Sequence, residues 1–307
     1  MNSRLSGDWW NQNKRPILEG EGVLLGDIFR YPAQDFHVDQ AAGSALFDGL
    51  SPESPKASIQ SAINLAVNGR GDRIWIKPGT YEENLDTTGK DCVHLYGVLA
   101  GGYARPNVAP ASGSALKAGS QGVVTAHMRY VAVDAAAALV QEGNGFRHDD
   151  CVFDGDGNTG ALIEFHPVVD DDGFTASEGV LRRSYVRDSG GVGILFVNPG
   201  PPAGVGPTGV VIEKNIFVGN ADEDIKDDDT VDSNDVTFGN GIIRENDFMT
   251  KDKAVYIDLS EAPNNTGFLT ANRFAGEVNT TTVALVAGIV SAGNFAPEGI
   301  VGTIPAP

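Results

Sequence analysis

The sequence is poor in cysteine, poor in basic residues and without any long apolar run. Only two of its 307 residues are cysteines, Cys92 and Cys151. They could pair only if the fold brings them together, and two such thiols are more often small buried residues than a disulfide. No uncharged apolar stretch approaches the ~20 residues of a transmembrane helix, so we expect no membrane partner. The first residues contain no apolar h-region, so we also expect no signal peptide.

Basic residues are outnumbered by acidic ones. The chain has 22 Lys and Arg against 41 Asp and Glu, which gives a formal net charge of −19. A surface this negative would repel nucleic acid and anionic membranes, so neither is an expected partner. It also disfavours the binding of uronic acid polymers, unless cations or a local basic cleft intervene.

Several catalytic signatures are absent as well. The sequence has no Gly-x-Ser-x-Gly elbow, and no Walker or dinucleotide fingerprint in a strand–helix context. The histidines stand singly, without metal-ligand spacing to another His or Cys, so we expect structural roles for them. They are His37, His94, His127, His148 and His166.

What the sequence does contain is glycine and a repeated phrase. Its 39 Gly and 16 Pro suggest many turns between short strands. The phrase is a small polar residue, a variable residue and then Phe. Full copies are Asn215-Ile216-Phe217, Asn246-Asp247-Phe248 and Asn272-Arg273-Phe274, looser copies are Cys151-Val152-Phe153 and Ser184-Tyr185-Val186, and a compressed copy is Asn294-Phe295. The copies begin 33, 31, 31, 26 and 22 residues apart, and periods of this size mark stacked supersecondary units.

Stacking places equivalent residues above one another at the ~4.8 Å spacing of strands. We therefore predict an internal aromatic column, made of Phe153, Phe217, Phe248 and Phe274. We also predict a ladder of side-chain amides at a corner, made of Asn215, Asn246 and Asn272. Longer coils must loop outward, so segments able to carry function are expected to concentrate between residues 154 and 240.

Residues 48–85 carry the signals of a helix followed by a strand. Ser54 and Pro55 look like an N-cap and a first helical residue. An apolar stripe at helical spacing then predicts a helix over about 55–68. The stripe is Ile59, Ala62, Ile63, Ala66 and Val67. Ile74-Trp75-Ile76 predicts a strand, and Lys77-Pro78-Gly79-Thr80-Tyr81 predicts the turn after it.

This stretch resembles the N-terminal cap and first coil of the pectin-lyase-like right-handed parallel β-helix superfamily. The turn Asp48-Gly49-Leu50-Ser51-Pro52, the helix and the strand carry the resemblance. It implies an all-β fold, a right-handed parallel β-helix with an N-terminal capping helix and an extended N-terminal arm. We expect the arm at residues 1–34, the β-helix at 35–300 and a C-terminal tail at 301–307. The superfamily includes lyases, hydrolases, esterases and phage virion proteins, so the resemblance implies little about function.

The predicted arm contains a pair of tryptophans, Trp9 and Trp10. One interpretation is an extended segment lying over the end of the main domain. The other is a docking arm whose paired tryptophans anchor another chain, because aromatic anchors are common at interfaces.

Residues 222–235 form a dense acidic run. Its candidate Ca²⁺ ligands are Asp224, Asp227, Asp228, Asp229 and Asp232. The spacing is not that of an EF-hand, because the sixth position counted from Asp227 is Asp232 rather than Gly. A solvated acidic loop with no cofactor is the favoured interpretation, and the smaller cluster Asp170–Asp172 is interpreted in the same way.

The middle of the chain holds the candidates for polysaccharide chemistry. Carboxylate pairs for glycoside hydrolysis could come from Asp149, Asp150, Asp154 and Asp156, with Asp188 one coil on. Pectate-lyase-like chemistry would need an Arg or Lys base near a carboxylate-held Ca²⁺, and Arg182, Arg183 and Arg187 fall one coil after Asp170–Asp172. Adjacent strand residues point to opposite faces, so at most one of Arg182 and Arg183 is expected in a given site. Salt bridges on a solvated sheet are the favoured alternative.

No catalytic residue is carried over from the superfamily. The Gly-His-Gly and Arg-Ile-Lys elements of polygalacturonase-like hydrolases are missing, as are the Gln-Asp-Thr and Asp-Phe-Ile-Phe-Gly phrases of pectin methylesterase-like sites. We therefore predict a non-enzymatic structural component of a tailed-phage virion, such as a capsid decoration, head-fibre or tail protein. It would assemble in the host cytoplasm with other virion proteins or with itself, as a homo-oligomer, with a trimer expected from the habits of phage β-helices. The alternative is a lyase or glycoside hydrolase that binds a carbohydrate along the solenoid face.

Overall fold

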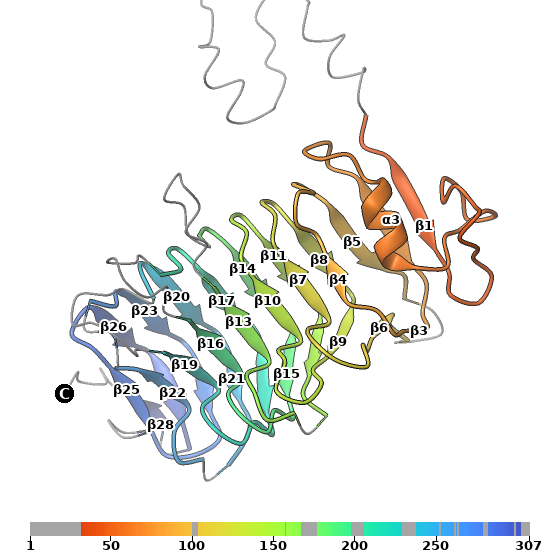
Figure 1. The fold of residues 1–307 in the computed structure, drawn as a ribbon. Helices are drawn as coiled ribbons and strands as arrows, with labels where there is room; N and C mark the ends of the chain where they lie inside the picture. Colours follow the sequence, from red (N-terminus) through yellow and green to blue (C-terminus); the bar gives the residue numbers. More distant parts are fainter. Residues whose placement is uncertain are drawn as a thin grey trace, which may run out of the picture.

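The computed structural model describes most of the chain from residue 32 onward. The described residues are 32–99, 104–156, 158–166, 177–197, 206–228, 238–251, 253–260, 262, 264–278, 282–297 and 299–301. They form a stack of coils whose short strands line up in three sheets (Figure 1). The predicted arm with Trp9 and Trp10, and most of the predicted C-terminal tail, lie outside these residues.

Every coil except the first and the last contributes one strand to each of three sheets, here named A, B and C. Sheet A has ten strands in the spatial order β1 (Asp35–Val38), β2 (Arg73–Ile76), β5 (His94–Gly97), β8 (Val124–Ala126), β11 (Arg147–Asp149), β14 (Val180–Arg182), β17 (Val211–Glu213), β20 (Gly241–Arg244), β23 (Gly267–Thr270) and β26 (Ile289–Ala292). Sheet B has β3 (Thr80–Tyr81), β6 (Asn107–Val108), β9 (Arg129–Val131), β12 (Val152–Asp154), β15 (Tyr185–Arg187), β18 (Ile216–Val218), β21 (Asp247–Phe248), β24 (Arg273–Phe274), β27 (Asn294–Ala296) and β28 (Gly299–Val301). Sheet C has β4 (Leu85–Asp86), β7 (Leu116–Ala118), β10 (Leu139–Gln141), β13 (Ile163–Phe165), β16 (Ile194–Phe196), β19 (Ile225–Asp227), β22 (Ile257–Leu259) and β25 (Val283–Leu285).

The pairing within these sheets is parallel, apart from the antiparallel end pair β27–β28. Parallel neighbours require a crossover between them, and here the crossover is the rest of the coil. The structure is therefore a parallel β-helix, as the resemblance implied, and it is consistent with the right-handed form. The second residue of β28, Ile300, pairs with Phe295, so the apolar C-terminal segment begins as a strand of sheet B.

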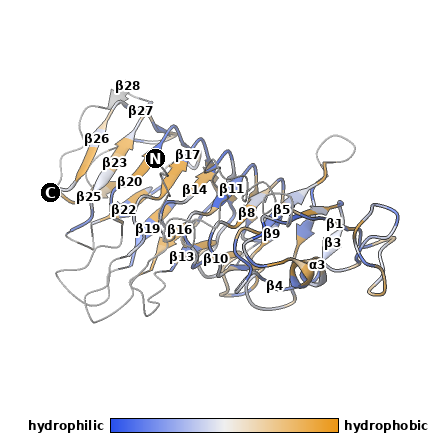
Figure 2. Ribbon diagram, turned by 90° about the horizontal axis from the view of Figure 1, so that it is seen from above, coloured by the Kyte–Doolittle hydropathy of each residue, from blue (hydrophilic) through white to orange (hydrophobic). Residues whose placement is uncertain are grey.

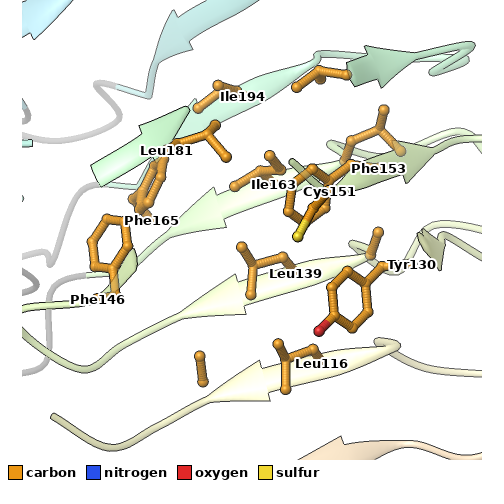
Figure 3. Close-up of a cluster of buried hydrophobic side chains, with 14 of the residues drawn as sticks. Leu116, Tyr130, Leu139, Phe146, Cys151, Phe153, Ile163, Phe165, Leu181 and Ile194 are labelled. Carbon is orange, nitrogen blue, oxygen red and sulfur yellow. The ribbon is translucent and has the colours of Figure 1, made fainter. Parts of the chain in front are cut away.

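The core is built of one residue per coil at each inward position. In sheet C the register stacks Leu116, Leu139, Ile163 and Ile194 on successive strands, and all four are fully buried (Figure 3). Hydrophobic colour accordingly follows the strands along the stack in Figure 2. Strands of alternating polarity bury one face and expose the other.

The corner between sheets A and B is a single residue in the left-handed region, repeated coil after coil. These residues are His127, Asp150, Arg183, Lys214, Glu245, Ala271 and Gly293, with φ of 59°, 50°, 52°, 57°, 56°, 56° and 66°. Residues other than glycine rarely adopt this backbone conformation, so the turn is imposed by the ladder of hydrogen bonds around it. The left-handed residue redirects the chain, and the residue after it lies inside the corner.

Those inner corner residues form the predicted amide ladder. Nδ2 of Asn215 donates to Oδ1 of Asn246 at 3.1 Å, and Nδ2 of Asn246 donates to Oδ1 of Asn272 at 3.0 Å. The ladder continues to Asn294, which accepts from Asn272 at 3.1 Å, and begins at Ser184. All four asparagines are buried, which confirms a role in stacking.

The predicted aromatic column is confirmed, with one interruption. Phe217, Phe248 and Phe274 stack with ring centroids 4.8 Å apart at each step. Val186 separates them from Phe153 in the same column. Phe295 is not part of the column and is exposed, because the compressed phrase lacks its variable residue and places the ring at the outward position paired with Arg273.

The predicted helix is present but shorter. α3 (Ile59–Leu65) packs against β1, β2 and β4 and buries Ile59, Ala62 and Ile63. Its N-cap is Ser58 and not Ser54, because Lys56 forms a parallel bridge with Val38 and the helix begins only after it. The carboxylate of Glu83 accepts from the backbone N–H of Ile59 and of Gln60, which completes the cap.

Two smaller expectations also have outcomes. Cys151 is a buried thiol and not half of a disulfide, as expected. Among the residues that the structure describes, no helix has the length and apolar character to cross a bilayer. The segments predicted to loop out between residues 154 and 240 lie largely outside the described residues.

Candidate active site

Charged side chains from several coils converge at the corner between sheets A and B. At the centre, the carboxylate of Asp149 is buried beneath three guanidinium groups. Arg147 donates to it from its own strand at 2.9 Å, Arg182 from the next strand at 2.9 Å, and Arg183 from the following corner at 2.6 Å. One carboxylate facing three arginines leaves a local excess of positive charge.

A second buried carboxylate lies on the sheet B side of the same corner. Oδ2 of Asp154 accepts from Arg129 at 2.9 Å and from Arg187 at 2.6 Å. Burial raises the pKa of Asp154, but the two guanidinium groups outweigh this and hold its pKa below the usual value. Asp154 therefore carries a full negative charge at neutral pH.

The third carboxylate, that of Asp150, joins an arginine to a histidine. Arg105 donates to Oδ1 of Asp150 at 2.8 Å, and Nδ1 of His127 lies 2.7 Å from its Oδ2. Burial raises the pKa of Asp150, but the hydrogen bonds from Arg105 and His127 lower it by more than burial raises it. The pKa of Asp150 is therefore below its usual value. An ionised carboxylate can only accept, so Nδ1 of His127 must carry the proton that it shares.

This assignment fixes the chemistry of the other ring nitrogen. In the neutral imidazole with a proton on Nδ1, Nε2 has a lone pair and can act as a base. The side chain of His127 is 40% exposed, so the ring is open to solvent at the corner. An imidazole oriented by a carboxylate is the usual arrangement of a general base, and the resulting imidazolium is stabilised by the same carboxylate.

Together these residues form what we call the arginine–aspartate cluster. It consists of Arg105, His127, Arg129, Arg147, Asp149, Asp150, Asp154, Arg182, Arg183, Arg187 and Asp188. Six arginines face four aspartates, so the arginines of the cluster outnumber its aspartates by two. In a chain of net charge −19, this is the local basic surface that a polyanion would need.

The predicted candidates in this region are brought together, with one correction. Asp149 and Asp154 form salt bridges with Arg182, Arg183 and Arg187, which is the favoured alternative for these arginines, and Asp150 lies at the same corner. The expectation that at most one of Arg182 and Arg183 enters a site was wrong, since both bind Asp149. Arg183 is not a strand residue but the left-handed corner residue, so the alternation of a strand does not apply to it.

The remaining acidic candidates lie elsewhere. Asp156 is only part of a turn, in which its backbone N–H donates to Asp154, and Asp170–Asp172 lie outside the described residues. In the acidic run, Asp224 is buried and paired with Lys253 at 2.9 Å, and burial raises its pKa. Asp227 is also buried and accepts from Asn265 at 2.7 Å, so these two do not belong to a solvated loop.

A Ca²⁺ site in the acidic run stays a prediction. Asp228 follows β19, while Asp229 and Asp232 lie outside the described residues. Within the described part of the chain, no group of three or more His, Cys, Asp or Glu side chains is placed to hold a metal ion.

A second pair of histidine and carboxylate lies on the outer face of sheet C. Nε2 of His166 is 2.8 Å from Oε2 of Glu164, and the neighbouring Lys117 pairs with Glu142 at 3.2 Å. Two carboxylates and one ammonium make this surface negative overall. It is therefore the less suitable of the two for an anionic ligand.

Sequence reasoning assigned structural roles to all five histidines, and His148 fits that assignment. His148 is fully buried between Thr125 and Gln141, and burial lowers its pKa to about 3. His127 was missed as a functional candidate. The sequence carried no clear signal for this contact, because the residues after His127, Met128-Arg129-Tyr130, do not match the repeated phrase.

The sequence matches no protein-family model and no curated protein. The structure is similar to the alginate lyase from Paenibacillus sp. str. FPU-7, with 17% identity and a TM-score of 0.55 over 78% of this chain and 83% of that one. It is similar to Escherichia coli ybhc, with 14% identity and a TM-score of 0.53 over 86% of this chain and 76% of that one. Carrot pectin methylesterase has 11% identity and a TM-score of 0.49 over 86% and 82% of the two chains.

These comparisons correct the prediction of a non-enzymatic virion component. The alginate lyase, with a TM-score above 0.5, is an enzyme by its name and not a structural protein of a phage. The virion prediction was therefore wrong, and the alternative of a polysaccharide-active protein is the better supported one. At these identities the likeness shows the fold alone. The chain has the pectin lyase-like parallel β-helix fold.

Proposed function

We propose that this chain is a polysaccharide-active enzyme, and specifically a lyase that cleaves an acidic, uronate-containing polysaccharide at the arginine–aspartate cluster. The observation that carries the proposal is the exposed His127–Asp150 pair beside a surplus of arginine. A parallel β-helix offers a long regular surface on which a polymer can lie across several coils.

The arginines would bind and neutralise the carboxylate of the sugar. Arg183 gives two of its five N–H donors to Asp149 and is 55% exposed, and Arg187 gives two donors to Asp154 and is 40% exposed. A guanidinium can form paired hydrogen bonds with a second carboxylate, which makes arginine well suited to uronates. Asp149 and Asp154 would hold these side chains in place.

The elimination then needs one base and one acid. Nε2 of His127 takes the proton from the carbon next to the uronate carboxylate, and the electrons of that C–H bond form a carbon–carbon double bond. The bond from the neighbouring carbon to the glycosidic oxygen breaks, and the oxygen leaves with a proton that the imidazolium of His127 can return. Arginine next to the carboxylate stabilises the negative charge that builds up in the transition state.

Glycoside hydrolysis fits the same residues less well. It requires a carboxylic acid whose pKa is raised so that it can protonate the leaving oxygen. In the cluster, neighbouring arginines hold the pKa values of Asp150 and Asp154 below the usual range. The proposed elimination needs no protonated carboxylic acid, so it is compatible with ionised Asp150 and Asp154.

The test is the formation of unsaturated uronate ends, followed by ultraviolet absorbance, on a panel of acidic and neutral polysaccharides. We expect wild-type protein to cleave at least one polyuronate and no neutral polymer. The variant His127→Ala should lose about 100-fold or more in kcat/KM, the usual contribution of a general base.

The matched control is His166→Ala, which removes the other exposed histidine paired with a carboxylate. We expect its activity to stay within about twofold of wild type, because surface changes away from a site rarely matter. Cleavage of neutral polymers, or loss of activity in His166→Ala but not in His127→Ala, would contradict the proposal.

A further inference from the structure

A row of aromatic side chains lies on the outer face of sheet A, before the arginine–aspartate cluster. His37, Trp75 and Tyr96 occupy paired positions on the adjacent strands β1, β2 and β5. The rings of Trp75 and Tyr96 have centroids 5.1 Å apart and are tilted by 31°. Tyr96 therefore supports one side of the indole, which restricts the movement of Trp75.

A cavity of about 280 Å³ opens beside Trp75. It is lined by His37, Trp75, Lys77 and Val98 from sheet A and its edge, and by Pro52 and Pro55 from the segment before α3. Its lining is mostly apolar ring and chain surface, with the ammonium of Lys77 as a cationic group. The rings of His37, Trp75 and Tyr96 are partly buried, and a cavity with a mostly apolar lining suits a ligand with an apolar face.

Neighbouring acidic groups hold the two key side chains. Nε1 of Trp75 donates to Asp35 at 3.1 Å, and Nζ of Lys77 pairs with Asp39 at 2.8 Å. The polar atom of the indole is thus satisfied by the protein. What Trp75 offers a ligand is its ring surface, in a fixed position.

The cavity and the cluster lie on the same row of the sheet. Trp75 pairs with Tyr96, Tyr96 with Ala126, and Ala126 with Asp149. Ala126 directly precedes His127, so the cavity is two strands from the proposed base, or about 10 Å at the spacing of parallel strands. A polymer laid along the stack would reach both.

We propose that this cavity is a sugar-binding subsite that holds one ring of the acidic polysaccharide at a distance from the reacting bond. The apolar face of the sugar would pack on Trp75, and the ammonium of Lys77 would attract the sugar carboxylate. This subsite rests on the proposed function for the identity of its ligand. Binding of the sugar at this subsite can be measured without cleavage of the polysaccharide.

The experiment measures binding of uronate oligosaccharides of increasing length by calorimetry, in the His127→Ala background so that the ligand survives. Adding Trp75→Ala should weaken binding of the longer oligosaccharides about tenfold, and should leave the shortest ones unchanged. Trp75→Phe keeps an aromatic ring and should restore most of the affinity. Phe268→Ala, which removes another exposed ring from sheet A, is the matched control and should change nothing.

The outcomes separate the two proposals. If wild-type protein cleaves no polyuronate but binds oligosaccharides through Trp75, the subsite stands and the proposed function fails. If it cleaves them and Trp75→Ala binds long oligosaccharides as tightly as its parent, the subsite is wrong and the function stands.

Discussion

Replacing Asn246 with alanine tests whether the asparagines hold the coils together. The side chain of Asn246 is fully buried and makes four hydrogen bonds. It donates to the carbonyl of Ile212 at 2.9 Å and to Asn272 at 3.0 Å, and it accepts from the backbone and the side chain of Asn215 at 2.9 and 3.1 Å. Alanine removes all four and leaves the carbonyl of Ile212 and two N–H donors of Asn215 without these partners.

A buried polar group left without a partner costs about 1–3 kcal/mol, and some of this is recovered when neighbours relax. We therefore expect Asn246→Ala to lower the free energy of unfolding by about 3–5 kcal/mol. Asn246→Ser should lie between alanine and wild type, because Ser184 fills the first position of the same ladder and its hydroxyl both accepts and donates there. The assay is chemical denaturation followed by circular dichroism.

The matched control is Asn64→Ala on the exposed surface of α3. Its side-chain oxygen accepts only from Gln60 on the same helix, so the change should stay within about 0.5 kcal/mol. If Asn246→Ala were no more costly than Asn64→Ala, the ladder would not stabilise the stack, and the interpretation of the repeat would be wrong.

Two further predictions concern the core. Burial lowers the pKa of His148 in the folded protein to about 3, from the usual 6.5, so the unfolded chain is protonated first and the free energy of unfolding falls as the pH drops below 6.5. Chemical denaturation should show a loss of about 2 kcal/mol between pH 7 and pH 5, and the variant His148→Gln should lack this loss. An equal loss in His148→Gln would show that His148 is not its cause. A Cβ added at Gly179 would lie 1.9 Å from a ring carbon of Phe146, which is stacked between His148 and Phe165 at 5.3 Å each. Gly179→Ala should therefore cost about 1–3 kcal/mol in the same assay, and Gly79→Ala, whose nearest neighbour is the flexible end of Gln40, clearly less.

The stacking could be predicted from the sequence because every coil repeats the same environments. Asparagine inside the corner and phenylalanine two residues later recur wherever the phrase is complete. Phe295 was not part of the predicted column, and its ring points outward because one residue of the phrase is missing there. Alternation along the chain decides which face a side chain takes, so a single deletion reverses it.

The candidate site was predictable only in part. Aspartates and arginines in neighbouring coils could be expected to meet, and Asp149 does meet Arg182 and Arg183. The His127–Asp150 and Arg105–Asp150 contacts join residues 23 and 45 positions apart, and coil lengths are too irregular for such register to be counted from the sequence. The left-handed conformation of Arg183 could not be predicted from residue type, because arginine has no preference for it.

The central claim is that an acidic polysaccharide binds at the corner between sheets A and B. The most direct test is the crystal structure of the His127→Ala variant soaked with a uronate oligosaccharide. We predict sugar carboxylates within hydrogen-bonding distance of Arg183 or Arg187, and a ring beside Trp75. An oligosaccharide bound instead on the outer face of sheet C, beside His166 and Glu164, would contradict the account.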